Sequence, residues 1–140
     1  MNITQQINDY ISTIAEPKQS EIETLHRHVI QLFPTALLWF FDGKDEEGKI
    51  ISNPNIGYGC YTIQYTNGKM KDFYRIGISA NTSGISVYVM GLENKHYLSD
   101  NYGKTIGKAS ITAYCIKFKS LKDVNMHVLE EILKERLRID

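Results

Sequence analysis

A first possible metal-binding pattern in this sequence is Glu23-x-x-His26, which lies within a predicted helix. This spacing is one half of the site in di-iron helical bundles, which also needs a second such pair and further glutamates on facing helices. His26 and His28 are two residues apart and project about 200° from each other on a helix, so they cannot share one ion. Because a metal needs several converging ligands, a solvated surface histidine is the favoured interpretation.

A phosphate-binding loop is the second possibility, at Gly57-x-Gly59. Phosphate loops lead into the N-terminus of a helix, whose free N–H groups and dipole bind the anion. Here the two glycines lead into a predicted strand, so we interpret them as residues that let the backbone bend or approach another element. Lys108 and its neighbouring lysines could contact phosphates, but no Walker-type framework surrounds them.

Nucleophilic catalysis is disfavoured by the sequence. Cys60 and Cys115 have no basic neighbour at an activating spacing, and both are predicted to be inert strand residues. The serines lie in no nucleophile elbow, and no spacing rule assembles a catalytic triad with the histidines. The sequence therefore favours a protein that is not an enzyme.

Tyrosines are concentrated late in the chain, with eight of the nine at or after Tyr58. Tyrosine is a common half-buried strand residue, so packing at the core and rim is one interpretation. The other is an aromatic-lined pocket or partner surface whose hydroxyl groups orient a small ligand. The residue pattern leaves both open.

Composition indicates one globular domain over residues 1–140, because 42% of the residues are hydrophobic, 23% are charged and the formal net charge is zero. Between residues 101 and 122 there are five lysines and no acid, which indicates either a solvated strand edge or a surface for an anionic partner. The two widely separated cysteines predict a reducing cytoplasm. No apolar run approaches the roughly 20 residues of a membrane span.

The elements that would position these residues begin with two amphipathic helices. Ile3 to Ile14 form one apolar stripe, and a second stripe runs from Ile22 to Phe33 after Pro17. The apolar run 36–41 is interpreted as a buried strand, and the polar segment 42–49 as an exposed loop.

Alternation with a period of two then predicts strands. Asn67-Gly68 is typical of a type I′ turn, so Tyr61 to Tyr65 should form a hairpin with Tyr74, Ile76 and Ile78. A third strand is predicted over 85–90 and a further one over 112–118.

Two more helices are predicted in the second half of the chain. A short one over 93–102 should end with a left-handed Gly103, and a C-terminal one should begin at a capping box formed by Ser120 and Asp123. Strands in the middle with helices at the ends predict an α+β fold. We expect two layers: a mostly antiparallel sheet with two N-terminal helices, one short inserted helix and a C-terminal helix.

A set of short motifs, read in order, resembles a known family. The motifs are Pro54-x-Ile56-Gly57-Tyr58-Gly59-x-Tyr61, Gly77-Ile78-Ser79, Val87-Tyr88-Val89-Met90, Ile106-Gly107-Lys108, Cys115 and Leu121-x-Asp123-Val124. Together they resemble the YdhG-like family, a bacterial domain of unknown function, over residues 10–133. The chain departs from the family at Thr112-Ala113-Tyr114, where members often have Thr-Gly-Lys. The resemblance implies a small cytosolic α+β domain.

The leading functional hypothesis is a non-enzymatic module that binds a small molecule or a protein partner, with no cofactor and with Tyr58, Tyr61, Tyr74 and Lys108 as its ligand-binding residues. One branch of the family is linked to frataxin-like iron handling, which implies a first alternative in which Glu21, Glu23 and His26 bind iron. A second alternative, weak nucleic-acid binding through the lysines of 101–122, is disfavoured by the zero net charge. The sequence leaves the oligomeric state open.

Overall fold

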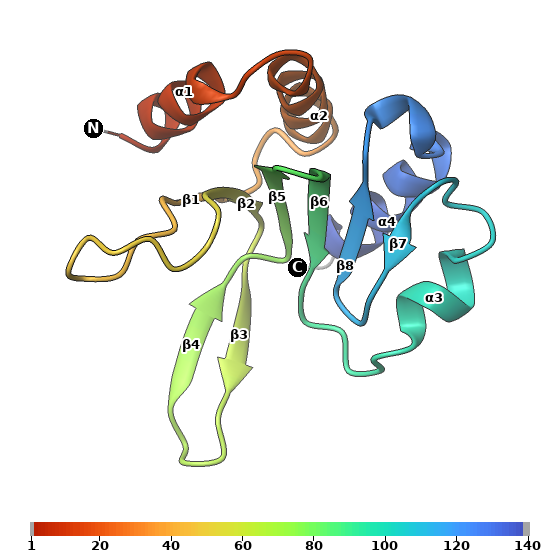
Figure 1. The fold of residues 1–140 in the computed structure, drawn as a ribbon. Coiled ribbons are helices and arrows are strands. Elements are labelled where there is room, and N and C mark those ends of the chain that lie inside the picture. The colour runs from red at the N-terminus through yellow and green to blue at the C-terminus, as the bar shows by residue number, and fades with distance from the viewer. Residues whose placement is uncertain (1, 139–140) are drawn as a thin grey trace.

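The computed structural model describes residues 2–138, which fold around a six-stranded antiparallel sheet (Figure 1). Its strands are β1 (Leu38–Phe41), β2 (Asn55–Tyr58), β5 (Ile76–Asn81), β6 (Gly84–Val89), β8 (Cys115–Phe118) and β7 (Ser110–Ile111), in that spatial order. The expected strand in 36–41 is therefore confirmed, and the expected strand over 112–118 is shorter and pairs with a two-residue strand before it.

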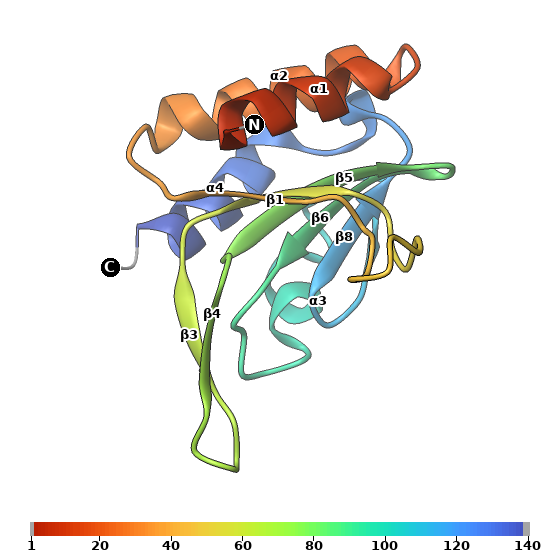
Figure 2. The same cartoon turned by 90° about the vertical axis from the view of Figure 1, so that its left-hand side faces the viewer.

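A separate hairpin projects from the sheet at the point where β2 ends (Figure 2). It consists of β3 (Tyr61–Gln64) and β4 (Met70–Phe73), joined through Gly68, which has the positive φ of a left-handed turn residue. The position of the predicted hairpin turn is confirmed, but its predicted type and its predicted pairing are wrong. A type I′ turn needs a positive φ at Asn67 as well as at Gly68, and among the described residues only glycines have a positive φ. Ile76 and Ile78 pair with β2 instead of β3, because the chain leaves the hairpin after Phe73 and re-enters the main sheet.

Three helices cover one face of the sheet. In both views α1 and α2 lie side by side along one side of the strands, and in Figure 1 α4 lies behind β6 and β8. The fourth helix, α3, follows β6 and contacts α4 through two tyrosine hydroxyls that bind Glu135. The helices are α1 (Ile3–Thr13), α2 (Lys18–Leu32), α3 (Tyr97–Tyr102) and α4 (Met126–Leu137).

Strict alternation along the strands separates a buried face from an open one. On the face toward the helices lie apolar side chains that form one cluster with the helix stripes, and Ile56, Ile78, Val87 and Ile116 are cross-strand neighbours there. This arrangement confirms the predicted α+β class, with a mostly antiparallel sheet, two N-terminal helices, a short inserted helix and a C-terminal helix.

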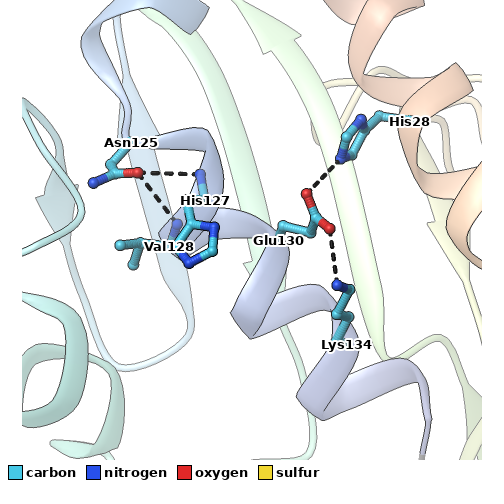
Figure 3. Close-up of polar contacts among 6 residues, drawn as sticks. All are labelled: His28, Asn125, His127, Val128, Glu130 and Lys134. Carbon is cyan, nitrogen blue, oxygen red and sulfur yellow. Dashed lines mark hydrogen bonds and ion pairs between the residues drawn. The ribbon is translucent and has the colours of Figure 1, made fainter.

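The start of the C-terminal helix differs from the predicted capping box. Asn125 is the N-cap of α4, and its side-chain oxygen accepts hydrogen bonds from the backbone N–H groups of His127 and Val128 (Figure 3). Ser120 instead donates its hydroxyl to Glu21 of α2, which also accepts from the Leu121 N–H at 2.9 Å. Residues 121–123 form a short 3₁₀ turn, so the competing tertiary contact displaced the local cap.

Helix α4 is also linked to α2 through a polar contact. Glu130 accepts from His28 Nε2 at 3.2 Å and pairs with Lys134 Nζ at 2.9 Å (Figure 3). The short helix α3 begins four residues later than predicted, and Gly103 after it has a right-handed φ of −57° instead of the expected left-handed one.

The aromatic ring of Tyr74 lies flat on two glycines that are neighbours across β2 and β5. Gly57 and Gly77 are paired in register on the open face, and a Cβ atom on Gly77 would lie 2.6 Å from the Tyr74 ring. A Cβ on Gly57 would come closer still. The side chain of Tyr74 is only 4% exposed, and Phe73 stacks beside it with ring centroids 4.2 Å apart.

This packing predicts that Gly77→Ala destabilises the fold by about 1–3 kcal/mol, because the new methyl group overpacks the space under the Tyr74 ring. Urea denaturation measures the loss. In a Tyr74→Ala background the same substitution should cost much less, and the double-mutant cycle should show a coupling of about 0.5 kcal/mol or more. Additive losses in the cycle would contradict the contact.

Candidate functional site

The open face of the sheet carries two parallel rows of side chains that no helix covers in Figure 1. The first row crosses the sheet at Trp39, Gly57, Gly77, Tyr88 and Cys115, with the Tyr74 ring on its two glycines. The second row crosses at Phe41, Asn55, Ser79, Ser86, Lys117 and Ser110.

Over β6 and β8 these rows form the floor of an open groove of about 600 Å³. This volume lies within the range of small-molecule sites. The groove walls come from the Asn81–Ser83 turn, from Asn53 and from the Thr112–Tyr114 segment. Tyr88 and Tyr114 are stacked at its side with ring centroids 6.5 Å apart, and Tyr114 is exposed. The groove therefore offers both aromatic and polar contacts.

Of the two buried serines on the open face, Ser86 lines the groove and Ser79 lies next to it across β5 and β6, and each has a hydrogen-bond partner. The Ser79 hydroxyl donates to the Pro54 carbonyl at 2.6 Å, and Asn81 Nδ2 donates to the Ser86 oxygen at 2.9 Å. Because Ser79 and Ser86 are almost completely buried, these bonds avoid the cost of unpaired polar groups. Asn81 also accepts from the Ser83 N–H, which orders the turn at the groove wall.

Three ionisable groups of the first row stay protonated near neutral pH. Burial raises the pKa of Tyr74, and the nearby Tyr88 and Cys115 raise it further. Burial also raises the pKa of Tyr88 and of the Cys115 thiol. The phenols are therefore hydrogen-bond donors, and the thiol is a poor nucleophile at this pH.

Positive charge enters the groove from one end. Lys117 lines it directly, and Lys117, Ser83 and Ser110 also line an adjoining hollow that includes Lys108 and Lys119. All three lysines are exposed, so their charges are solvated. The groove thus runs from an aromatic end at Tyr88 and Tyr114 to a cationic end at Lys117.

The structure does not bring the four predicted ligand-binding residues into one cavity. Tyr58 is completely buried on the helix side of the sheet, where its hydroxyl contacts His26 Nδ1 at 2.7 Å. Tyr74 lies on the opposite face, beside the groove, and Lys108 lines the adjoining hollow. Tyr61 lies at the base of the projecting hairpin.

Sequence reasoning missed Ser86, Tyr88 and Lys117 as groove residues. The alternation of side chains along strands 84–89 and 115–118 could have predicted which residues of each strand share a face. The sequence could not predict that these residues lie close together, because this depends on the antiparallel register that places Ser86 opposite Lys117 and Tyr88 opposite Cys115.

The three residues of the iron alternative are each engaged separately. Glu21 binds Ser120 and Leu121, Glu23 pairs with Arg27, and His26 contacts Tyr58. A second Glu-x-x-His spacing, at Glu93 and His96, lies in an exposed segment before α3. Among residues 2–138, no group of three or more His, Cys, Asp or Glu side chains could hold a metal ion.

Comparison with protein-family models, with curated proteins and with solved structures found no match for this chain. The resemblance to the YdhG-like family therefore stays a prediction. In the part of the chain that the structure describes, no helix is long and apolar enough to cross a membrane.

The environment of His26 predicts a pH dependence of stability. Burial lowers the pKa of His26, although Glu23 partly opposes the shift. The unfolded chain, with a His26 pKa near 6.5, therefore binds the proton more tightly than the folded chain. The free energy of unfolding should fall as the pH drops below about 6.5, by less than about 1.4 kcal/mol per pH unit for one part-buried group.

His26→Gln keeps a polar partner for the Tyr58 hydroxyl and removes the titrating ring, so its loss of stability between pH 7 and pH 5 should be shallower than that of the wild type. His96→Gln removes an exposed histidine and serves as the matched control. Chemical denaturation across this pH range measures both slopes. Equal slopes in the wild type and His26→Gln would contradict the assignment.

Proposed function

We propose that this chain is a small cytoplasmic YdhG-like domain that binds a small molecule on the open face of its sheet and is not an enzyme. The single observation that carries the proposal is the groove of about 600 Å³ over β6 and β8, which combines stacked tyrosines, a polar serine floor and lysines at one end. Small-molecule sites typically combine an apolar wall with a few placed polar groups.

The aromatic end of the groove fits a planar ring. Tyr88 and Tyr114 both line the groove, and an aromatic pair contributes about 0.5–1.5 kcal/mol beyond the area that it buries. The raised pKa of Tyr74 keeps its hydroxyl protonated beside Tyr88. Tyr88 lines the groove itself and burial also raises its pKa, so its protonated hydroxyl can donate to an acceptor on the ligand.

The cationic end fits a carboxylate or another anionic group on the same ligand. Lys117 lies in the groove, while Lys108 and Lys119 in the adjoining hollow add positive potential around it. A ligand with a planar ring at one end and an anion at the other would satisfy both ends. We therefore expect small aromatic carboxylates to be the best simple mimics of the ligand.

The family and cellular location rest on separate arguments. The ordered motifs support the YdhG-like assignment, and the confirmed α+β fold is the one that the resemblance implies. Cys60 and Cys115 are both free thiols, as is usual in a reducing compartment, which supports a cytoplasmic location.

Titration with benzoate and 4-hydroxybenzoate, followed by amide chemical shifts in NMR, tests the proposal. We expect the largest shifts in β6, β8 and the Asn81–Ser83 turn. Lys117→Gln should weaken binding about fivefold or more because it removes a charge-assisted contact, and Tyr88→Phe should weaken it about two- to fivefold by removing one donor.

Lys71→Gln provides the matched control, because it removes the same charge from an exposed position on the hairpin and should leave binding unchanged. The proposal fails if these compounds shift no amides on the open face up to tens of millimolar. It also fails if Lys117→Gln and Tyr88→Phe bind them as tightly as the wild type does.

A further inference from the structure

Arg136 is a buried cation on the helix side of the molecule, away from the groove. It projects from the last turn of α4 and is only 9% exposed. Its Nη2 donates to the Met90 carbonyl at 2.7 Å, and its Nε has no partner among the described residues. Within residues 2–138 no carboxylate lies within ion-pair distance of this guanidinium. A buried charge without a counterion costs several kcal/mol, which calls for an explanation.

A second arginine lies close to the first. Burial lowers the pKa of Arg136, and the neighbouring charge of Arg75 lowers it further. Arg75 comes from the segment between β4 and β5, and its Nε donates to the Cys60 carbonyl at 2.8 Å. Two guanidinium groups near each other repel, so their proximity adds to the cost of burying Arg136.

Tyr61 completes the cluster at the base of the hairpin. Its pKa is raised by burial, and the charges of Arg136 and Arg75 partly oppose this shift. The two arginines are linked through Met90, whose N–H donates to the Arg75 carbonyl and whose carbonyl accepts from Arg136. Gly91 allows the close approach, since a Cβ there would lie 2.7 Å from Arg136 Nη2 and 3.3 Å from the Tyr61 ring. Three donors from distant parts of the sequence therefore converge on one place.

Glu135, the acid next to Arg136 in the sequence, forms no ion pair with Arg75 or Arg136 among the described residues. Glu135, beside Arg136 on α4, accepts hydrogen bonds from the hydroxyls of Tyr97 and Tyr102. It raises the pKa of Arg136 from a distance, but its oxygens are held by the two tyrosines of α3. Arg75 also lines a hollow of about 270 Å³ with Gly59 and Leu137, so an anion can reach this member of the cluster from solvent.

We propose that Tyr61, Arg75 and Arg136 form a binding site for a small oxyanion, a phosphate or carboxylate group. A guanidinium has five N–H donors, and the protein bonds described here use one on each arginine. The remaining donors and the Tyr61 hydroxyl suit an oxyanion, with which arginine forms the strongest charge-assisted hydrogen bonds. None of these three residues lines the groove over β6 and β8.

Thermal unfolding of the full chain in sodium phosphate, sodium acetate and sodium chloride at matched ionic strength tests the site. An anion that binds only the folded state raises the midpoint with concentration, and we expect a rise of about 2 °C or more over chloride. A larger rise in phosphate identifies a phosphate group as the preferred oxyanion, and a larger rise in acetate identifies a carboxylate.

Arg75→Gln and Arg136→Met should each weaken the anion's apparent affinity about tenfold, whereas Tyr61→Phe should weaken it several-fold. Arg138→Gln removes the same charge from an exposed residue next to α4 and should keep the full midpoint rise. Arg75 is only half buried, so Arg75→Gln decides the question even where Arg136→Met fails to fold.

The site is disproved if neither phosphate nor acetate raises the midpoint of the wild type above that in chloride. It is equally disproved if Arg75→Gln and Tyr61→Phe retain the wild-type rise. Because the readout is the stability of the chain without any groove ligand, its result does not depend on whether benzoate binds the open face.

Discussion

The contact of the Tyr74 ring with the paired glycines Gly57 and Gly77 is the constraint on which much of the remaining structure depends. No residue with a side chain can replace either glycine without displacing the ring, so β2 and β5 are held in the register that pairs these two positions. That register sets which residues of both strands face the helices. It also brings the Tyr74 hydroxyl toward Tyr88 and Cys115.

The same contact explains why the hairpin is separate from the main sheet. Tyr74 folds back over β2 and β5, so the chain cannot continue directly from β4 into β5 as one straight strand. The hairpin leaves at Gly59, whose φ of +78° is left-handed, and returns at Arg75. Tyr61, Arg75 and Arg136 lie at this junction. The contact of Tyr74 with the two glycines therefore shapes the open face and also helps to bring these three side chains together.

Local patterns predicted most elements of this fold, and long-range contacts account for the errors. The position of the Asn67-Gly68 turn was predicted correctly because the preference of Gly68 for a positive φ is local, although Asn67 does not adopt the positive φ of the predicted type I′ turn. The strand partners of the hairpin depended on how Tyr74 packs, which no local pattern reveals. Ser120 had the sequence of a helix cap, but Glu21, about a hundred residues away, binds its hydroxyl. Tyr58 was selected for its motif and aromatic type, yet the alternation of its own strand directs it to the core.

The lysines at the groove and the cluster around Arg136 are two cationic regions that differ in how deeply their charges are buried. The net charge of the chain does not reveal this difference. The lysines at the groove are exposed, so water and salt screen them and their presence costs the fold little. Arg136 is buried beside a second arginine, where screening is weak and the desolvation of its charge destabilises the folded state. Exposed lysines therefore need no counterion to be stable, whereas a buried guanidinium with unused donors does. The formal charge of zero disfavours a polyelectrolyte partner but not a small anion, because binding a small anion requires only a local cluster of positive charge.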